Sequence, residues 1–118
     1  MKIIILGHNS FTGVALNKFF SKFPSNEIYL IGRKPIVQDN FFLFEISNDH
    51  DKNETNLLNI FDEIEVDDNS VIINLISEGN VDNCEKNPDM SIFLNIDFVK
   101  SIYRTLKKFK CRWCWHGN

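Results

Sequence analysis

The stretch Gly7-His8-Asn9-Ser10-Phe11-Thr12-Gly13 decides how this chain folds, because it separates two apolar segments with different patterns. The segment before it, residues 2–6, is a short β-branched run typical of a strand buried on both faces. After it, apolar residues recur at helical spacing as far as Phe23, and Pro24 ends the pattern. We therefore expect a strand, a tight glycine turn and a helix in direct succession.

A glycine turn in this place is suited to bind phosphate. Gly7 at the strand end permits a sharp turn and lets a ligand approach the backbone closely. The first amides of the following helix have no intrahelical partner and lie at the positive end of the helix dipole, so they attract anions. Gly13 lets the helix pack closely against the sheet. The segment therefore predicts a cradle for the two phosphates of a dinucleotide.

The rest of the chain alternates between extended and helical patterns, without an internal repeat or a linker. Further strands are expected at 28–31, 41–44, 71–76 and 111–115, and further helices at about 54–64 and 88–108. This order predicts one α/β domain over residues 1–118, incomplete at its carboxyl end. The expected architecture is a Rossmann-like, doubly wound, mainly parallel five-stranded sheet in the order 3-2-1-4-5, truncated after the fifth strand.

Composition excludes several classes of protein. With 43% hydrophobic and 25% charged residues, the chain is neither disordered nor membrane-spanning in character. The formal net charge of −3 provides no positive field, so neither nucleic acid nor a membrane is expected as a partner. The apolar run at residues 2–6 is too short for a signal peptide. We therefore expect a cytoplasmic protein whose thiols at Cys84, Cys111 and Cys114 stay reduced.

The glycine stretch resembles the G-x-x-G-F-x-G fingerprint of the extended short-chain dehydrogenase/reductase superfamily, in its NAD-dependent epimerase/dehydratase family. Phe11 and Gly13 match in register, and Ser10 stands where the family has its middle glycine. The resemblance implies an NAD(P)-binding portion of a protein that acts on nucleotide sugars. The Ser10 side chain either crowds the cofactor or bonds a phosphate oxygen through its hydroxyl.

The end of the second strand bears on the choice of cofactor, because a carboxylate there would bind the adenosine ribose hydroxyls. Residues 28–31 instead run into Gly32-Arg33-Lys34, with no carboxylate in that place. Two cations are suited to a 2′-phosphate, so NADP is favoured over NAD. The alternative is that both cations are ordinary exposed charges beside a turn.

The resemblance extends along most of the chain. It implies that Glu45, with the amide of Ile46, contacts the adenine, and that residues 75–77 pass beside the nicotinamide-side ribose. The expected cofactor-binding residues are Gly7, Asn9, Ser10, Phe11, Thr12, Gly13, Arg33, Lys34, Glu45, Ile46, Leu75, Ile76 and Ser77. His8 either touches a phosphate or faces solvent, and we expect it to face solvent.

The family's catalytic groups follow the fifth strand: a Ser or Thr, then a Tyr-x-x-x-Lys pair on the next helix. Here His116-Gly117-Asn118 stands in the place of the Ser-rich segment and ends the sequence, while Tyr29 and Tyr103 lie in earlier elements. We therefore expect the chain taken alone to be catalytically silent, because the family's Ser or Thr and its Tyr-x-x-x-Lys pair are absent after the fifth strand. Two other classes stay open, a stand-alone NADP-binding regulatory module and a Rossmann-shaped interaction protein that binds no nucleotide.

The last strand raises two further points. Trp113 and Trp115 point to one face and Cys114 to the other, so an apolar edge strand is left uncovered and predicts a homodimer or completion by a further segment. Cys111 and Cys114 with His116 do not make up a complete zinc motif. Since residues three apart in a strand face opposite ways, we expect both cysteines to be packing residues and expect no metal.

Overall fold

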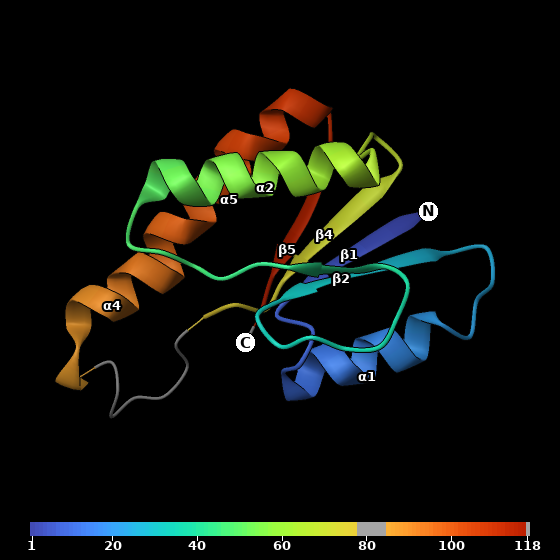
Figure 1. The fold of residues 1–118 in the computed structure, drawn as a ribbon, viewed down its shortest axis with the longest axis horizontal. Helices are drawn as coiled ribbons and strands as arrows, with labels where there is room; N and C mark the ends of the chain where they lie inside the picture. Colours follow the sequence, from blue (N-terminus) through green and yellow to red (C-terminus); the bar gives the residue numbers. More distant parts are fainter. Residues whose placement is uncertain (78–84, 118) are drawn as a thin grey trace.

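A parallel sheet of five strands carries the fold (Figure 1). The computed structural model describes residues 1–77 and 85–117. The strands are β1 (Lys2–Leu6), β2 (Glu27–Gly32), β3 (Phe41–Leu43), β4 (Ser70–Asn74) and β5 (Trp113–His116). Their order is β3-β2-β1-β4-β5 and every neighbouring pair is parallel, which confirms the predicted sheet. The carboxyl ends of the strands therefore lie along one edge.

Helices cover both faces of this sheet, as expected for a doubly wound fold. They are α1 (Phe11–Phe20), α2 (His50–Ile64), α4 (Pro88–Ile92) and α5 (Phe98–Leu106), with a π-helical turn η1 (Phe93–Asp97) before α5 and a 3₁₀ turn η2 (Lys107–Phe109) after it. Figure 1 shows α1 on one face, with α2 and α5 on the other. Among the described residues, no helix has the length and apolar character needed to cross a bilayer.

Element boundaries differ from the expected ones where side chains cap the backbone. Helix α2 begins at His50, earlier than expected, because the Asp49 side chain accepts hydrogen bonds from the first free amides of the helix. Strand β5 begins at Trp113, two residues later than expected, because Lys110 adopts a left-handed conformation (φ 58°) that ends η2. The single helix expected at 88–108 is interrupted by the π-helical turn.

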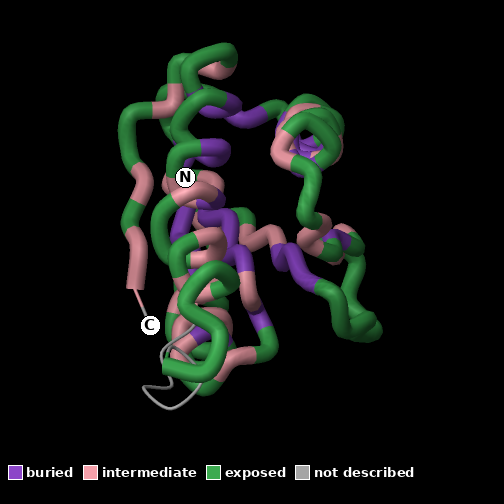
Figure 2. The backbone as a smooth tube through the Cα atoms, turned by 90° about the vertical axis from the view of Figure 1, so that its left-hand side faces the viewer, coloured by how far each residue is buried: buried purple, intermediate pink, exposed green. Residues whose placement is uncertain are grey.

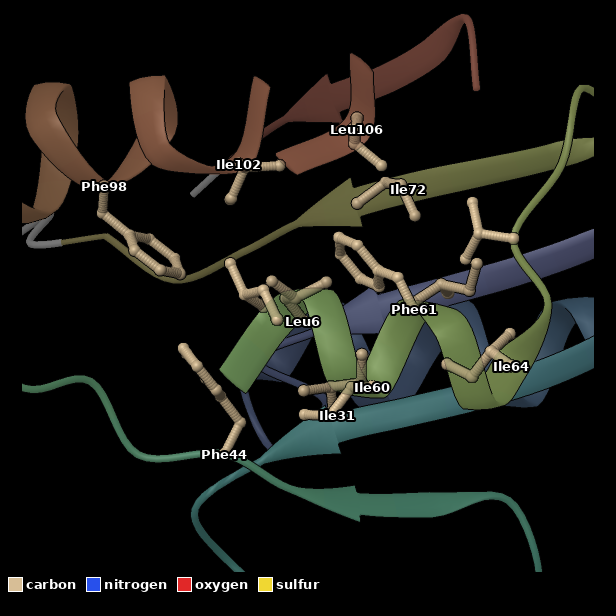
Figure 3. Close-up of a cluster of buried hydrophobic side chains, with 13 residues drawn as sticks. Leu6, Ile31, Phe44, Ile60, Phe61, Ile64, Ile72, Phe98, Ile102 and Leu106 are labelled. Atoms are coloured by element: carbon tan, nitrogen blue, oxygen red, sulfur yellow. The ribbon is translucent and has the colours of Figure 1, made fainter. Parts of the chain in front are cut away.

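The larger part of the core lies between the sheet and the pair α2 and α5. Figure 3 shows Phe61 and Phe98 pointing into this cluster, which also contains Leu6, Ile31 and Ile72 of the central strands. Phe44 stacks on Phe98, with ring centroids 5.9 Å apart, and so joins the end of β3 to α5. This packing fixes the loop after β3 beside the carboxyl edge of the sheet.

The face of the sheet that α1 covers has a smaller core, and the sheet extends beyond this helix to β5. Leu16 and Phe20 of α1 pack against a cluster that includes Ile73, a neighbour in register of Trp115 on β5. Trp113 and Trp115 remain 63% and 55% exposed. Figure 2 shows the strand that leads to the C-terminus without a buried residue. The alternation predicted for β5 is thus observed, and its tryptophans form an apolar surface on the α1 face.

Candidate functional site

A cavity of about 590 Å³ opens at the carboxyl ends of β1, β2 and β4. Most of the residues that the sequence singles out line it, namely Gly7, Asn9, Ser10, Arg33, Glu45, Ile46, Leu75, Ile76 and Ser77. Four of the expected residues, Phe11, Thr12, Gly13 and Lys34, do not line it. The topology thus brings separate segments of the sequence, after different strands, to one place.

Gly7 forms the sharp turn that opens this cavity. Its φ of +83° lies in the left-handed region, and its N–H donates to the Ile31 carbonyl over 2.8 Å. A Cβ added at Gly7 would lie 3.2 Å from the Leu75 carbonyl carbon and 3.2 Å from Ile76 Cγ1. Glycine is therefore required here both by backbone conformation and by the close approach of the segment that follows β4.

Gly13 has a different role, which is to seat α1 on the turn. A Cβ at Gly13 would lie 2.7 Å from both the Gly7 and the His8 carbonyl oxygens. The missing side chain lets the first helical turn approach the end of β1 and brings the helix amino terminus to the cavity. Phe11, at the start of the same helix, is 93% exposed and points away from the core.

Ser10 caps α1, a role that the sequence interpretation did not include. Its Oγ accepts a hydrogen bond from the Gly13 N–H over 3.0 Å, and its backbone is extended. This contact satisfies one of the free amides at the helix start. Ser10 also lines the cavity, at the end of α1 where the helix dipole is positive.

Arg33 supplies the cationic side of the cavity, whereas Lys34 does not line it. Both residues are exposed, and within the described ranges neither forms an ion pair. Glu45 lines the same cavity. A guanidinium that lines a cavity together with a glycine turn is suited to a phosphate monoester, because its fork of donors matches two phosphate oxygens.

The expectation that His8 faces solvent is wrong. The side chain is buried, with 5% exposure, and its Nε2 lies 2.9 Å from the Lys34 carbonyl oxygen. The reason is the glycine at position 32: a Cβ there would lie 2.7 Å from His8 Cδ2, so the absent side chain leaves room for the ring. The interpretation from the sequence missed this because the two residues meet only across neighbouring strands.

The loop that carries Glu45 and Ile46 is held by Asn53, a residue that the sequence interpretation missed. Asn53 is fully buried on α2; its Oδ1 accepts from the Ser47 N–H over 2.9 Å and its Nδ2 donates to the Ser47 carbonyl over 2.9 Å. One signal was present in the sequence, since Asn53 shares the helical spacing of the apolar face formed with Leu57.

The other side of the cavity is apolar and was also not foreseen. Phe44, Met90, Phe93 and Leu94 line it, the last three from α4 and the π-helical turn η1. The His50 ring stacks on Phe93, with centroids 5.0 Å apart. A cavity with one apolar wall and one polar wall that carries a cation is suited to an aromatic base joined to phosphate.

A second cavity of about 290 Å³ adjoins the first and shares Ile76, Ser77 and Leu94 with it. Asn74 and His116, the last residues of β4 and β5, line it. Burial lowers the pKa of His116. Burial also raises the pKa of Cys114, whose Sγ lies 3.2 Å from His116 Nε2, to about 12. Both groups are therefore neutral near pH 7, and the thiol is a poor nucleophile.

The cysteines of the last segment do not face opposite ways as expected. Cys111 and Cys114 both pack against the larger core cluster. The alternation rule fails because Cys111 precedes the first residue of β5, so only Cys114 belongs to the strand. Across residues 1–77 and 85–117, no three His, Cys, Asp or Glu side chains are grouped as a metal site would need. Cys84 lies outside the described residues.

The spacing Tyr-x-x-x-Lys occurs once, at Tyr103 and Lys107, although not in the place where the family has it. Tyr103 lies on α5, ahead of β5, and Lys107 follows that helix. Both side chains are exposed, and neither lines the two cavities at the carboxyl edge. The Tyr103 ring contacts His116, with centroids 5.3 Å apart. Tyr103 and Lys107 therefore have the spacing of the family's pair but not its position, because they precede the fifth strand and lie outside both cavities.

Solved structures with the same fold include enzymes of nucleotide-sugar chemistry. A hypothetical dTDP-4-dehydrorhamnose reductase from Sulfolobus tokodaii has a TM-score of 0.76 and 21% identity, over 98% of this chain and 38% of that one. The UDP-glucose 4-epimerase of Thermotoga maritima, solved with UDP-glucose, has a TM-score of 0.77 and 15% identity, over 98% and 37%. MoeE5, solved with UDP-glucose and NAD, has a TM-score of 0.72 and 12% identity, over 98% and 36%.

The chain thus spans a little more than a third of the length of each of these proteins. No protein-family model and no curated protein matches the sequence. At such identities the likeness concerns the backbone and its topology. The chain therefore has the Rossmann-like α/β fold that a reductase, an epimerase and an NAD complex share over this part of their length.

Proposed function

We propose that this chain is the dinucleotide-binding portion of a protein that resembles nucleotide-sugar epimerases, dehydratases and reductases. The observation that carries the proposal is the joining of the Gly7 turn, Arg33 and the loop at Glu45 around one cavity. Gly7, Asn9 and Ser10 place the turn before α1 in the cavity, so a diphosphate would lie near the positive end of the helix dipole. The apolar wall at Phe44 and Phe93 offers a surface to a base.

NADP is the proposed cofactor, in preference to NAD. Support comes from the cavity itself, in which Arg33 has no ion-pair partner among the described residues and Gly32 stands where a ribose-binding carboxylate would be. Glu45 and Ile46 line the same cavity, and in this proposal they contact the adenine. Two of the expected residues that do not line the cavity act indirectly, Gly13 by seating α1 and Lys34 through its backbone carbonyl.

Titration of the purified chain with NADPH and NADH, followed by nicotinamide fluorescence, tests this proposal. We expect Arg33→Gln to weaken NADPH binding by roughly tenfold to a hundredfold, because charge-assisted hydrogen bonds of about 1.5–3 kcal/mol are lost. Binding of NADH should change little. Arg112→Gln, an exposed arginine remote from the cavity, is the matched control. Absence of binding by either dinucleotide would favour the non-binding interaction protein instead.

We also propose that this portion is catalytically silent alone and acts in the cytoplasm, where the free thiols of Cys111 and Cys114 stay reduced. Silence is argued from the position of Tyr103 and Lys107, which lie outside both cavities. The test is NADPH-dependent turnover of UDP- and dTDP-sugars by the purified chain and by Tyr103→Phe. Turnover that Tyr103→Phe abolishes would contradict silence and assign the chemistry to this tyrosine.

The exposed tryptophans of β5 are the proposed contact with another copy of the chain or with a further polypeptide segment. Trp113 and Trp115 lie on an edge strand, where backbone donors and acceptors are available for pairing. Sedimentation equilibrium of the wild type should show self-association, and Trp113→Thr with Trp115→Thr should weaken it. A monomeric wild type at high micromolar concentration would contradict pairing with a second copy.

A further inference from the structure

We propose that His8 is a specificity-determining residue for the dinucleotide, acting through the backbone of the Arg33–Lys34 segment. The inference rests on the proposed function, since it concerns which of two dinucleotides the cavity at Arg33 prefers. His8 does not line this cavity. It is therefore a positioning residue, which holds the segment that carries the cationic side chain.

The first step is the direction of the hydrogen bond between His8 and Lys34. A carbonyl oxygen only accepts, so the 2.9 Å contact requires that His8 Nε2 carries the hydrogen and donates it. The ring is buried and lies edge-to-face with Phe41, with centroids 5.3 Å apart and planes at 75°. The imidazole therefore has one orientation, set by neighbours on two sides.

The second step is what this contact does to Arg33. On the amino side of Arg33, the Gly32 carbonyl accepts from the Phe44 N–H over 2.9 Å. On its carboxyl side, the Lys34 carbonyl accepts from His8. Arg33 is thus held between two anchored residues at the point where the chain leaves β2. Its side chain begins from a fixed backbone, which lowers the entropy lost when the guanidinium binds a phosphate.

The third step concerns the residue that precedes Arg33. A Cβ at Gly32 would lie 2.7 Å from His8 Cδ2 and 3.2 Å from His8 Nε2. No side chain fits at position 32 while the His8 ring is in place, so no ribose-binding carboxylate can stand there. His8 therefore acts twice: it excludes the group that would favour NAD, and it orders the group that favours NADP.

The experiment compares three single variants by their Kd for NADPH and for NADH. His8→Phe keeps an aromatic ring over Gly32 but removes the donor, and we expect it to lower the preference for NADPH about tenfold. His8→Gln restores an amide donor and should keep the preference within about threefold of the wild type. Thr105→Val removes a buried hydroxyl that bonds Ser101 on α5, away from the cavity, and should lower stability without changing the preference.

A double variant tests the exclusion of a carboxylate. Gly32→Asp alone should unfold at a lower temperature, because the new Cβ collides with the ring. His8→Ala with Gly32→Asp should regain stability and bind NADH more tightly than NADPH, since the space is freed and a carboxylate faces the ribose. Equal destabilisation by Gly32→Asp with and without His8 would overturn this part of the inference.

The outcomes separate this inference from the proposed function. A wild type that binds neither dinucleotide overturns both the proposed function and the specificity assigned to His8. A wild type that prefers NADPH, with a preference that His8→Phe leaves intact, overturns the assignment of His8 only. Nitrogen-15 NMR of the imidazole gives a result independent of any ligand. The Nε2–H tautomer is expected, and the Nδ1–H tautomer would exclude the hydrogen bond from His8 to the Lys34 carbonyl and overturn the inference.

Discussion

Asn74 and His116 end two neighbouring strands and are joined by a hydrogen bond between Asn74 Nδ2 and His116 Nδ1, 3.0 Å apart. The Asn74 Oδ1 accepts from the Ile76 N–H over 3.1 Å, so the amide nitrogen faces the ring. Nδ1 is therefore the acceptor, and the hydrogen of neutral His116 lies on Nε2, directed at Cys114 Sγ. The edge strand is thus tied through Asn74 to the segment that lines both cavities.

Stability should fall as the pH is lowered through the titration range of His116. Burial holds its pKa in the folded state below the ordinary value of 6.5, so the unfolded chain binds the proton first. From about pH 6.5 downwards, proton binding stabilises the unfolded state more than the folded state, so the free energy of unfolding falls until the folded-state pKa is reached. Cys114, Asn74 and the Tyr103 ring face His116, and none of them is a cation. Urea midpoints at pH 7.5 and 5.5 measure the effect, and His116→Gln should make the two midpoints more alike.

Cys114 should react slowly with alkylating reagents. Burial raises its pKa from 9.0 to about 12, so at pH 8 its thiolate fraction is on the order of a thousandfold below that of a thiol with the ordinary pKa. The measurement is the rate of reaction with iodoacetamide in a variant that keeps Cys114 alone, with Cys84→Ser and Cys111→Ser. An unfolded sample in urea is the control, and a folded-state rate equal to its rate would contradict the prediction.

Asn53→Ala should destabilise the fold by about 1–3 kcal/mol, because the N–H and carbonyl of Ser47 lose buried partners. The loop that carries Glu45 should become disordered at the same time. The free energy of unfolding in urea gives the first effect, and amide hydrogen exchange at residues 45–48 gives the second. Asn59→Ala on the exposed face of α2 is the matched control, with an expected change within about 0.5 kcal/mol.

Gly7→Ala should cost about 1–2 kcal/mol from the left-handed backbone alone, and more because the added Cβ crowds Leu75 and Ile76. Chemical denaturation measures the loss. Asn9→Ala, in the same turn but exposed, should leave stability within about 0.5 kcal/mol. A Gly7→Ala variant as stable as Asn9→Ala would mean that the turn relaxes readily and that its geometry is not fixed by β4.

Much of the candidate site could be predicted from local sequence patterns. The apolar run of residues 2–6, the glycine stretch and the amphipathic segment after it predict a strand, a turn and a helix, and the structure has them as β1 and α1. The later strands follow from the same reasoning, and their carboxyl ends carry Arg33 and Glu45 to the cavity. The boundaries of helices and strands were harder to predict, because they depend on capping side chains such as Asp49.

The roles of residues that act through partners distant in the sequence could not be predicted. His8 was expected in solvent, and its burial depends on the missing Cβ of Gly32 on the neighbouring strand. Asn53 looks like one more polar residue of a helix until the loop at Ser47 is placed against it. Cys111 was expected in the last strand, whereas β5 begins only at Trp113.

The sequence by itself determined the order of strands and helices, the glycine turn and the parallel sheet, because hydrophobic period, turn chemistry and right-handed crossovers are set by residues near one another in the chain. Only the tertiary structure decided that Ser10 caps α1, that His8 tethers Lys34 and that Asn74 joins His116. Each of these rests on which polar atoms meet when packed elements exclude water, and burial makes an unpaired donor or acceptor costly.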